Sequence, residues 1–137
     1  MATPSNTLID DFLKMLLQGT DPSWRANANL YLSLHTANPG AGGNQSTSEA
    51  TYGSYARQVV AHSSGGFTIA SHSGTNANAI NFPVCTGGSE TLTHIAIGTS
   101  ASGAGTVLLS IALAASLAVS APIQPIFPAS SLTFTLA

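Results

Sequence analysis

Charged side chains are scarce in this sequence of 137 residues. Asp, Glu, Lys and Arg make up 6% of the chain, whereas an ordinary soluble domain carries about 25%. Serine, threonine, asparagine and glycine must supply most of the polar surface, which leaves little charge to oppose association. With 44% hydrophobic residues, the composition favours a subunit covered by copies of itself or by a larger assembly. A secreted domain rich in serine and threonine is the alternative.

Basic residues, cysteines and long hydrophobic runs are also few, and each shortage excludes a class of function. The three basic residues, Lys14, Arg25 and Arg57, cannot form a cationic patch, so we expect no direct binding to nucleic acid. The single cysteine, Cys85, permits neither an intrachain disulfide nor a cysteine-based metal site. The most apolar stretch, residues 106–119, is shorter than the ~20 residues of a membrane span. It therefore predicts a buried core segment and no membrane partner.

Apolar residues near the start of the chain recur at the three- and four-residue spacing of an amphipathic helix. This pattern predicts a helix over residues 7–18, with Leu8, Phe12 and Leu16 as candidate docking residues on its apolar face. Thr7 is expected to cap the helix. The apolar face packs either on its own domain, which is the commoner arrangement, or on a neighbouring subunit.

Beyond the helix, the sequence changes to short apolar stretches separated by Gly, Asn, Ser and Pro. These stretches predict a mainly β fold, a single β-sandwich or jelly-roll-like domain of about eight antiparallel strands with one N-terminal amphipathic helix. Residues 1–25 would form the helix and arm, and residues 26–137 the sandwich domain. Residues 63–66 and 101–105 are expected to turn hairpins, and the prolines of residues 121–128 indicate an edge or crossing loop. The expected strands are 30–36, 55–62, 67–72, 76–82, 91–98, 106–112, 115–120 and 131–136.

No pattern typical of a catalytic or metal site stands out. The four histidines lack the spacing of a local metal chelate, and no carboxylate adjoins any of them. Beyond residue 25 only Glu49 and Glu90 are acidic, and the chain has neither a G-x-S-x-G elbow nor a P-loop. We therefore expect no enzyme activity, no cofactor and no metal. A small hydrolase, either a glycosidase with two carboxylates or a histidine metal enzyme, is the alternative.

His35 lies where the alternating stretch of residues 29–35 ends and a long Gly-rich loop begins. A histidine at such a place is either a catalytic base or a residue that ties the strand to the loop. Because the residues of a catalytic site are missing, we favour the structural interpretation. We expect His35 to hydrogen-bond to the loop of residues 37–54, and Glu49 to pair with Arg57 as a second tie.

Two stretches resemble a group of small virion proteins of tailed bacteriophages. The first is YLSLHTANPG (31–40) followed by NQSTSEATYGSYARQVV (44–60), and the second is NFPVCTGGSETLTHIAIGTSASGAG (81–105). The resemblance covers roughly residues 28–136, with Asn38 where the group has aspartate. The candidate loop and assembly residues in the first stretch are His35, Thr36, Asn38, Pro39, Gly40, Glu49, Tyr52, Tyr55 and Arg57.

The resemblance implies a structural virion protein that is made in the cytoplasm of a bacterial host. Some members of the group are labelled tail-fibre proteins, and others look like capsid decoration (cement) proteins. A fibre usually has a repetitive shaft, which this chain lacks, so we favour a decoration protein that stabilises the coat lattice on the outer head surface. Its expected partners are the major capsid protein and copies of itself in a homotrimer. The alternative is a tail-fibre or baseplate adhesin that binds host glycan through Trp24, Tyr31, Tyr52 or Tyr55.

Overall fold

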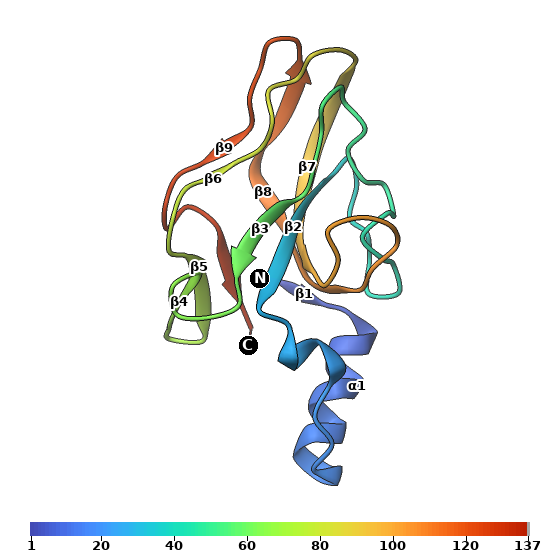
Figure 1. Cartoon of the computed structure of the whole chain (residues 1–137), viewed down its shortest axis with the longest axis vertical. Coiled ribbons are helices and arrows are strands. Elements are labelled where there is room, and N and C mark those ends of the chain that lie inside the picture. The colour runs from blue at the N-terminus through green and yellow to red at the C-terminus, as the bar shows by residue number, and fades with distance from the viewer. Residues whose placement is uncertain (137) are drawn as a thin grey trace.

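Antiparallel strands in three sheets form the body of the protein in a computed structural model that describes residues 1–136 (Figure 1). The strands are β1 (Thr3–Pro4), β2 (Asn29–His35), β3 (Gln58–Ala61), β4 (Phe67–Ala70), β5 (Ser73–Asn76), β6 (Ile80–Asn81), β7 (Ser89–Gly98), β8 (Val107–Ser120), β9 (Ile126–Phe127) and β10 (Thr133–Thr135). The largest sheet has the order β1-β8-β7-β2-β3, and the smaller ones are β10-β5-β4 and β6-β9. The prediction of a mainly β, sandwich-like domain with one N-terminal helix is confirmed. The jelly-roll variant and the division of the chain at residues 25 and 26 stay predictions.

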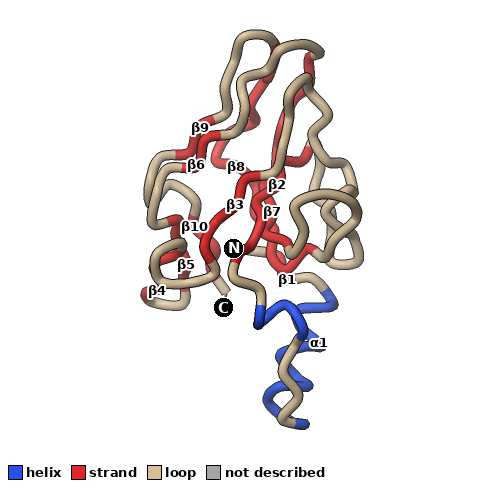
Figure 2. The backbone as a smooth tube through the Cα atoms, viewed as in Figure 1, coloured by secondary structure: helices blue, strands red, loops and turns tan. Residues whose placement is uncertain are grey.

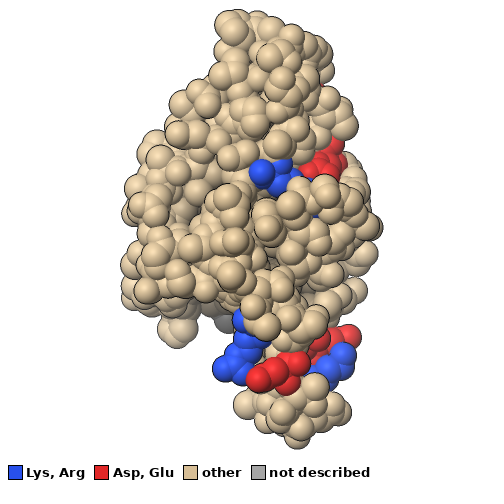
Figure 3. Space-filling model, viewed as in Figure 1, with Lys and Arg blue, Asp and Glu red and all other residues tan. Residues whose placement is uncertain are grey.

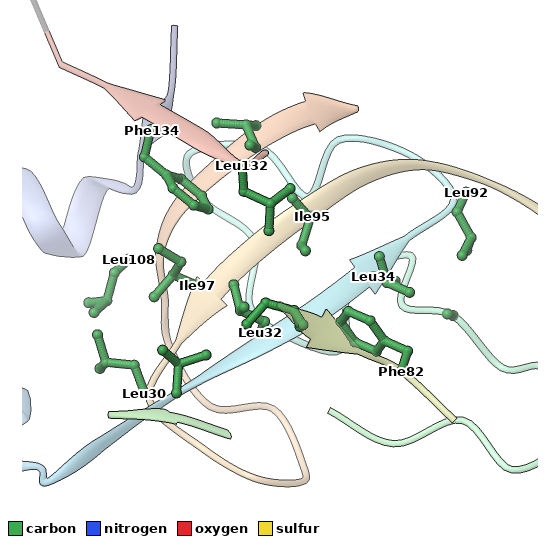
Figure 4. Packing of buried hydrophobic residues seen from close by; sticks show 14 of the residues in the cluster. Leu30, Leu32, Leu34, Phe82, Leu92, Ile95, Ile97, Leu108, Leu132 and Phe134 are labelled. Carbon is green, nitrogen blue, oxygen red and sulfur yellow. The ribbon is translucent and has the colours of Figure 1, made fainter. Parts of the chain in front are cut away.

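The hydrophobic core lies against one face of the five-stranded sheet, because alternate side chains of a strand point to the same face. Leu32 and Leu34 of β2 are 1% and 0% exposed, and Ile95 of β7 is also fully buried. Leu132 and Phe134, which lie in and just before β10, face this layer from the other side (Figure 4). Burying each large apolar side chain contributes about 1.5–3 kcal/mol, so these contacts hold the sheets together.

The sequence analysis did not predict β1 and β9. The strand pattern departs from the prediction in three further places. The stretches expected as two strands, 106–112 and 115–120, form the single strand β8, because both halves pair with β7 while the pairing skips residues 113–116. The turn at residues 63–66 makes no hairpin, since β3 and β4 belong to different sheets and the turn carries the chain between them. The stretch 76–82 is divided between the end of β5 and β6. The predicted hairpin turn between β7 and β8 is confirmed.

The N-terminal helix comprises α1 (Asn6–Leu13), which continues as a π-helical turn, η1 (Lys14–Gln18). Ser5 caps it, since its hydroxyl oxygen accepts a hydrogen bond from the Leu8 amide at 3.1 Å. The prediction that Thr7 caps the helix is wrong. The pairing of β1 with β8 places the start of the helix so that the cap lies two residues earlier in the chain, at Ser5. The Ser5 amide also donates to the Leu108 carbonyl at 2.9 Å, which fastens the helix start to β8. A short 3₁₀ helix, η2 (Ser23–Ala26), follows, and no helix within residues 1–136 is long and apolar enough to cross a membrane.

We expect the substitution Ser5→Ala to lower the free energy of unfolding by about 1 kcal/mol, because the Leu8 amide loses its acceptor. Urea denaturation measures the change. Thr7→Ala is the matched control and should alter stability by less than about 0.5 kcal/mol. If Thr7→Ala cost more than Ser5→Ala, the assignment of the cap would be wrong.

Candidate functional site

The loop after β2 covers the face of the five-stranded sheet that lies opposite the core. Ser33 and His35 point to that face, and both are 0% exposed. Strand β3 pairs with β2 only up to Leu32, so the loop replaces it beyond that point. The Thr36 amide donates to the Ser48 carbonyl at 2.8 Å, and the Ala50 amide donates to the carbonyl of β2 residue 34 at 2.8 Å. The loop is therefore built into the sheet rather than left free above it.

His35 joins strand β2 to this loop through both of its ring nitrogens. Its Nδ1 lies 2.8 Å from the Thr47 carbonyl oxygen, and a carbonyl can only accept, so Nδ1 carries the proton. Its Nε2 then accepts from the Ser33 hydroxyl at 2.8 Å. A serine bonded to a histidine is also the arrangement of a nucleophile and its base, but neither side chain is accessible to a substrate. The expected hydrogen bond from His35 to the loop is present.

Burial makes the stability of this site depend on pH. It holds the pKa of His35 below its ordinary value of 6.5, against the opposing effects of the Thr47 hydrogen bond and nearby Glu49. As the pH falls below 6.5, the unfolded chain takes up a proton that the folded chain does not, so the free energy of unfolding falls until the lowered pKa is reached. Each unit of lowering corresponds to about 1.4 kcal/mol. Urea midpoints at about pH 7.5 and about pH 5 measure this loss.

Two substitutions separate His35 from the other histidines. We expect His35→Gln to flatten the pH dependence, while His72→Gln, at an exposed position, leaves it unchanged. Part of the dependence remains in the first variant, because burial lowers the pKa of His94 as well. An undiminished pH dependence in His35→Gln would contradict the assignment.

A buried ion pair forms the second tie. Arg57 Nε donates to Glu49 Oε1 at 2.6 Å and Arg57 Nη2 to Glu49 Oε2 at 2.8 Å, with side chains 3% and 16% exposed. The Tyr55 hydroxyl donates to the same Glu49 Oε1 at 3.0 Å and accepts from the Leu34 amide at 3.0 Å. Burial raises the pKa of Tyr55 well above its usual value, and the hydrogen bond to Glu49 raises the pKa of Arg57. The expected pairing of Glu49 with Arg57 is present.

Arg57 also reaches the turn between β7 and β8. Its Nη1 donates to the Ser100 carbonyl at 2.9 Å, and its Nη2 to the Gly103 carbonyl at 2.5 Å. One guanidinium therefore joins the start of β3, the loop at Glu49 and the turn of residues 99–106. All of these contacts are internal, so the arrangement fixes the surface around it and leaves no reactive group free.

Gln45 is the residue of this site that the sequence analysis missed. Its side chain is fully buried, and its Oε1 accepts from the Ser100 amide at 2.9 Å. It occupies the space beside Gly98 and Gly105, where a Cβ would lie 2.1 Å from Gln45 Cδ and 2.2 Å from Gln45 Oε1 respectively. Its Nε2 finds no hydrogen-bond acceptor among residues 1–136. A glutamine in a polar loop carries no signal of burial, so only the folded structure reveals it.

The remaining loop residues shape the backbone. Asn38 Oδ1 accepts from the Gly40 amide at 2.9 Å, which is the turn contact expected from either asparagine or aspartate. Pro39 beside it is buried, and Thr36 donates through its hydroxyl to the Ser48 carbonyl at 3.3 Å. The structure thus brings His35, Thr36, Asn38, Glu49 and the residues that bind them into one connected loop.

The aromatic residues considered for glycan binding differ in exposure. Tyr52 is 3% exposed, and its hydroxyl donates to the Pro83 carbonyl at 3.0 Å, so it offers no exposed platform for a sugar. Trp24, Tyr31 and Tyr55 keep part of their surface accessible, although the Tyr55 hydroxyl is bonded to Glu49.

Glu90, one of the two carboxylates considered for catalysis, has structural contacts. Glu90 Oε1 accepts from the amides of Thr51 and Tyr52 at 2.8 and 2.9 Å, which ties the end of the loop to β7. Within residues 1–136, no group of three or more His, Cys, Asp or Glu side chains is placed to hold a metal ion.

The first half of the helix contacts the body, and the Trp24 indole nitrogen donates to Asp11 Oδ2 at 2.8 Å. Leu8 is 4% exposed and belongs to the core, whereas Phe12 is 45% and Leu16 78% exposed. Of the three predicted docking residues, one therefore packs on its own domain and two remain open. Figure 2 shows the helix extending beyond the strands, and Figure 3 shows that the charges on the visible face gather on this segment and at one spot of the body.

An apolar groove of about 970 Å³ opens beside the helix start. Leu8, Phe12 and Trp24 form one wall, and residues of β2, β4, β5, β8 and the C-terminal end form the others. No Asp, Glu, Lys or Arg stands among its described lining residues. A groove of this size and character is of the kind that takes an apolar partner.

Comparison with known protein families gives a match. The family model described as podophage GP4 fiber I protein gp80 matches residues 3–135. The match therefore includes the N-terminal helix, which lies outside the motifs that resemble phage virion proteins. It supports a phage virion protein without singling out the narrower, motif-defined group. No curated protein matches the sequence.

Proposed function

The chain belongs to the family of podophage GP4 fiber I protein gp80, and from this premise we propose that it is a subunit of a fibre carried on the virion tail. It is a structural protein of a phage particle. The observation that carries the proposal is the extent of the match, residues 3–135. The match covers the helix and every strand, so the proposal rests on the whole domain rather than on one motif.

The internal contacts support a mechanical rather than a catalytic role. His35, Arg57 and Gln45 fasten the long loop and the β7–β8 turn to the sheet through buried hydrogen bonds. Such ties make a surface rigid, and a rigid surface loses little conformational freedom when it docks against another subunit. We infer that this face of the domain is held in shape for contacts within the particle, and that the subunit assembles with copies of itself as a homotrimer.

Capsid decoration is the second candidate. The chain has no repetitive shaft, and its low charge suits a subunit that is covered on a crowded surface. In this role the protein would bind the major capsid protein on the outer head surface and join neighbouring coat subunits. Purified protein added to undecorated, expanded heads would then raise the melting temperature of the heads, and a lack of binding would exclude the role.

Separating heads from tails distinguishes the two candidates. Virions are disrupted, the heads and tails are separated on a density gradient, and each fraction is analysed for this chain by mass spectrometry. Recovery with the tails supports the fibre proposal, and recovery with the heads supports decoration. Absence from both fractions and from intact particles would overturn both.

The adhesin form of the fibre proposal has its own test. Trp24, Tyr31 and Tyr55 are the aromatic candidates that remain partly accessible. Reproducible signals on a glycan array that disappear in the Trp24→Ala variant would support sugar binding. An array without signal would leave the fibre subunit a scaffold rather than a receptor-binding part.

A further inference from the structure

The projecting helix carries an apolar face that its own domain does not cover. Leu16 and Leu17 are 78% and 75% exposed, and Ile9, Phe12 and Leu13 are 43–50% exposed. At ~200 Å² for a fully exposed large side chain, these five present roughly 600 Å² of surface. A stable interface buries about 800 Å² per partner, so this face supplies most of the area that one partner contributes.

Charges are confined to the other side of the helix. Within α1, at about 100° per residue, Ile9 and Leu13 lie on the same side as Phe12, and the exposed Leu16 and Leu17 continue this side into η1. Asp10, Asp11 and Lys14 lie on the remaining arc, and Lys14 pairs with Asp11 at 3.9 Å. The apolar face could therefore be buried without burying a charge.

The apolar groove fits this helix in size and chemistry. A helix about 10 Å wide fills roughly 400 Å³ per turn, so a groove of about 970 Å³ accepts about two turns. The exposed face runs from Ile9 to Leu17, which is about two and a half turns. Apolar residues such as Phe67, Ile69 and Leu109 line the groove, and no Asp, Glu, Lys or Arg stands among its described lining residues.

The helix cannot fill the groove of its own molecule. Its first turns, at Leu8 and Phe12, already form a wall of the groove, and the exposed part continues away from the body (Figure 1). We propose that the groove receives the projecting helix of a second copy of this chain. A helix-to-groove contact joins two different surfaces, so it repeats from copy to copy and closes into a ring where the rotation allows.

This inference rests on the self-association of the chain proposed above. It does not depend on whether the chain lies on the head or on the tail of the virion. A closed dimer would support it and exclude the trimer. Protein found in virion tails yet monomeric when purified would leave the fibre proposal standing and overturn the inference.

Light scattering after size exclusion tests the contact with three variants at exposed positions. Leu16→Glu with Leu17→Glu changes the helix, and Ile69→Glu, at a residue 74% exposed, changes the groove. Ile126→Glu is the matched control, because Ile126 is 53% exposed and lies outside the groove. We expect the wild type and the control to associate, and the helix and groove variants each to associate at least about a hundredfold more weakly. Circular dichroism checks that all variants fold.

Mixing the two defective variants makes the test specific. A copy with an intact groove and a copy with an intact helix still form one good contact, so an equimolar mixture should give a dimer that neither variant gives alone. A monomeric wild type, an unaffected helix or groove variant, or a mixture that stays monomeric would each overturn the inference. Loss of association in the helix variant alone would indicate a helix-to-helix contact instead.

Discussion

Replacing Arg57 by methionine is expected to lower the free energy of unfolding by about 3–5 kcal/mol, because the Glu49 carboxylate keeps its buried position without a cation. The carbonyls of Ser100 and Gly103 lose their donors at the same time. Equilibrium urea denaturation of the purified protein gives the change in free energy.

Arg25→Met is the matched control for Arg57→Met. Arg25 pairs with Asp21 at 2.5 Å, but both side chains are about 60% exposed, and a surface pair contributes less than about 1 kcal/mol. The double variant Arg57→Met with Glu49→Leu should recover part of the loss, since it removes the uncompensated charge. If Arg57→Met cost no more than Arg25→Met, the buried pair would not stabilise the loop.

The second large effect is expected at Gly98, where Gly98→Ala should cost about 3 kcal/mol. The added Cβ would lie 2.1 Å from Gln45 Cδ, so the buried glutamine must move and break its bond to the Ser100 amide. Gly87→Ala is the control, because nothing lies within 4 Å of a Cβ there. Thermal or urea unfolding measures both.

A double-mutant cycle identifies the cause of the Gly98 effect. In a chain that carries Gln45→Ala, the space beside Gly98 is open, and Gly98→Ala should cost much less than it does in the wild type. Equal costs in both backgrounds would mean that strain in β7 itself, rather than collision with Gln45, destabilises the variant.

The sequence predicts those parts of the fold that depend on local periodicity. The alternation around Leu32 and Leu34 placed β2, and the spacing of Leu8, Phe12 and Leu16 placed the helix. Periodicity says which residues share a face but not what covers that face, so it left open that Leu8 would be buried and Leu16 exposed. The turn at residues 63–66 shows the same limit, because a turn motif does not specify which sheet the next strand joins.

The site was predictable where two residues are chemically complementary. Beyond residue 25 Arg57 is the only basic residue and Glu49 one of two acidic ones, so their pairing could be expected from composition. Gln45 and the carbonyls of Ser100 and Gly103 gave no such signal, because backbone acceptors and neutral amides occur in every loop. Their contacts arise only when the loop and the β7–β8 turn meet in the folded chain.

The irregular pairing of β8 limits how another strand can pair along its open edge. Strand β8 has 14 residues and no charged side chain, and along its outer edge β1 pairs only with Leu109 and Ser110. A straight, uncharged edge of that length is a template for cross-β stacking. Because the ladder with β7 skips residues 113–116, the strand bends there, and an incoming strand can align with only a short part of it. The bend in the backbone thus hinders pairing at this edge, as lysine side chains do at the sheet edges of more highly charged proteins.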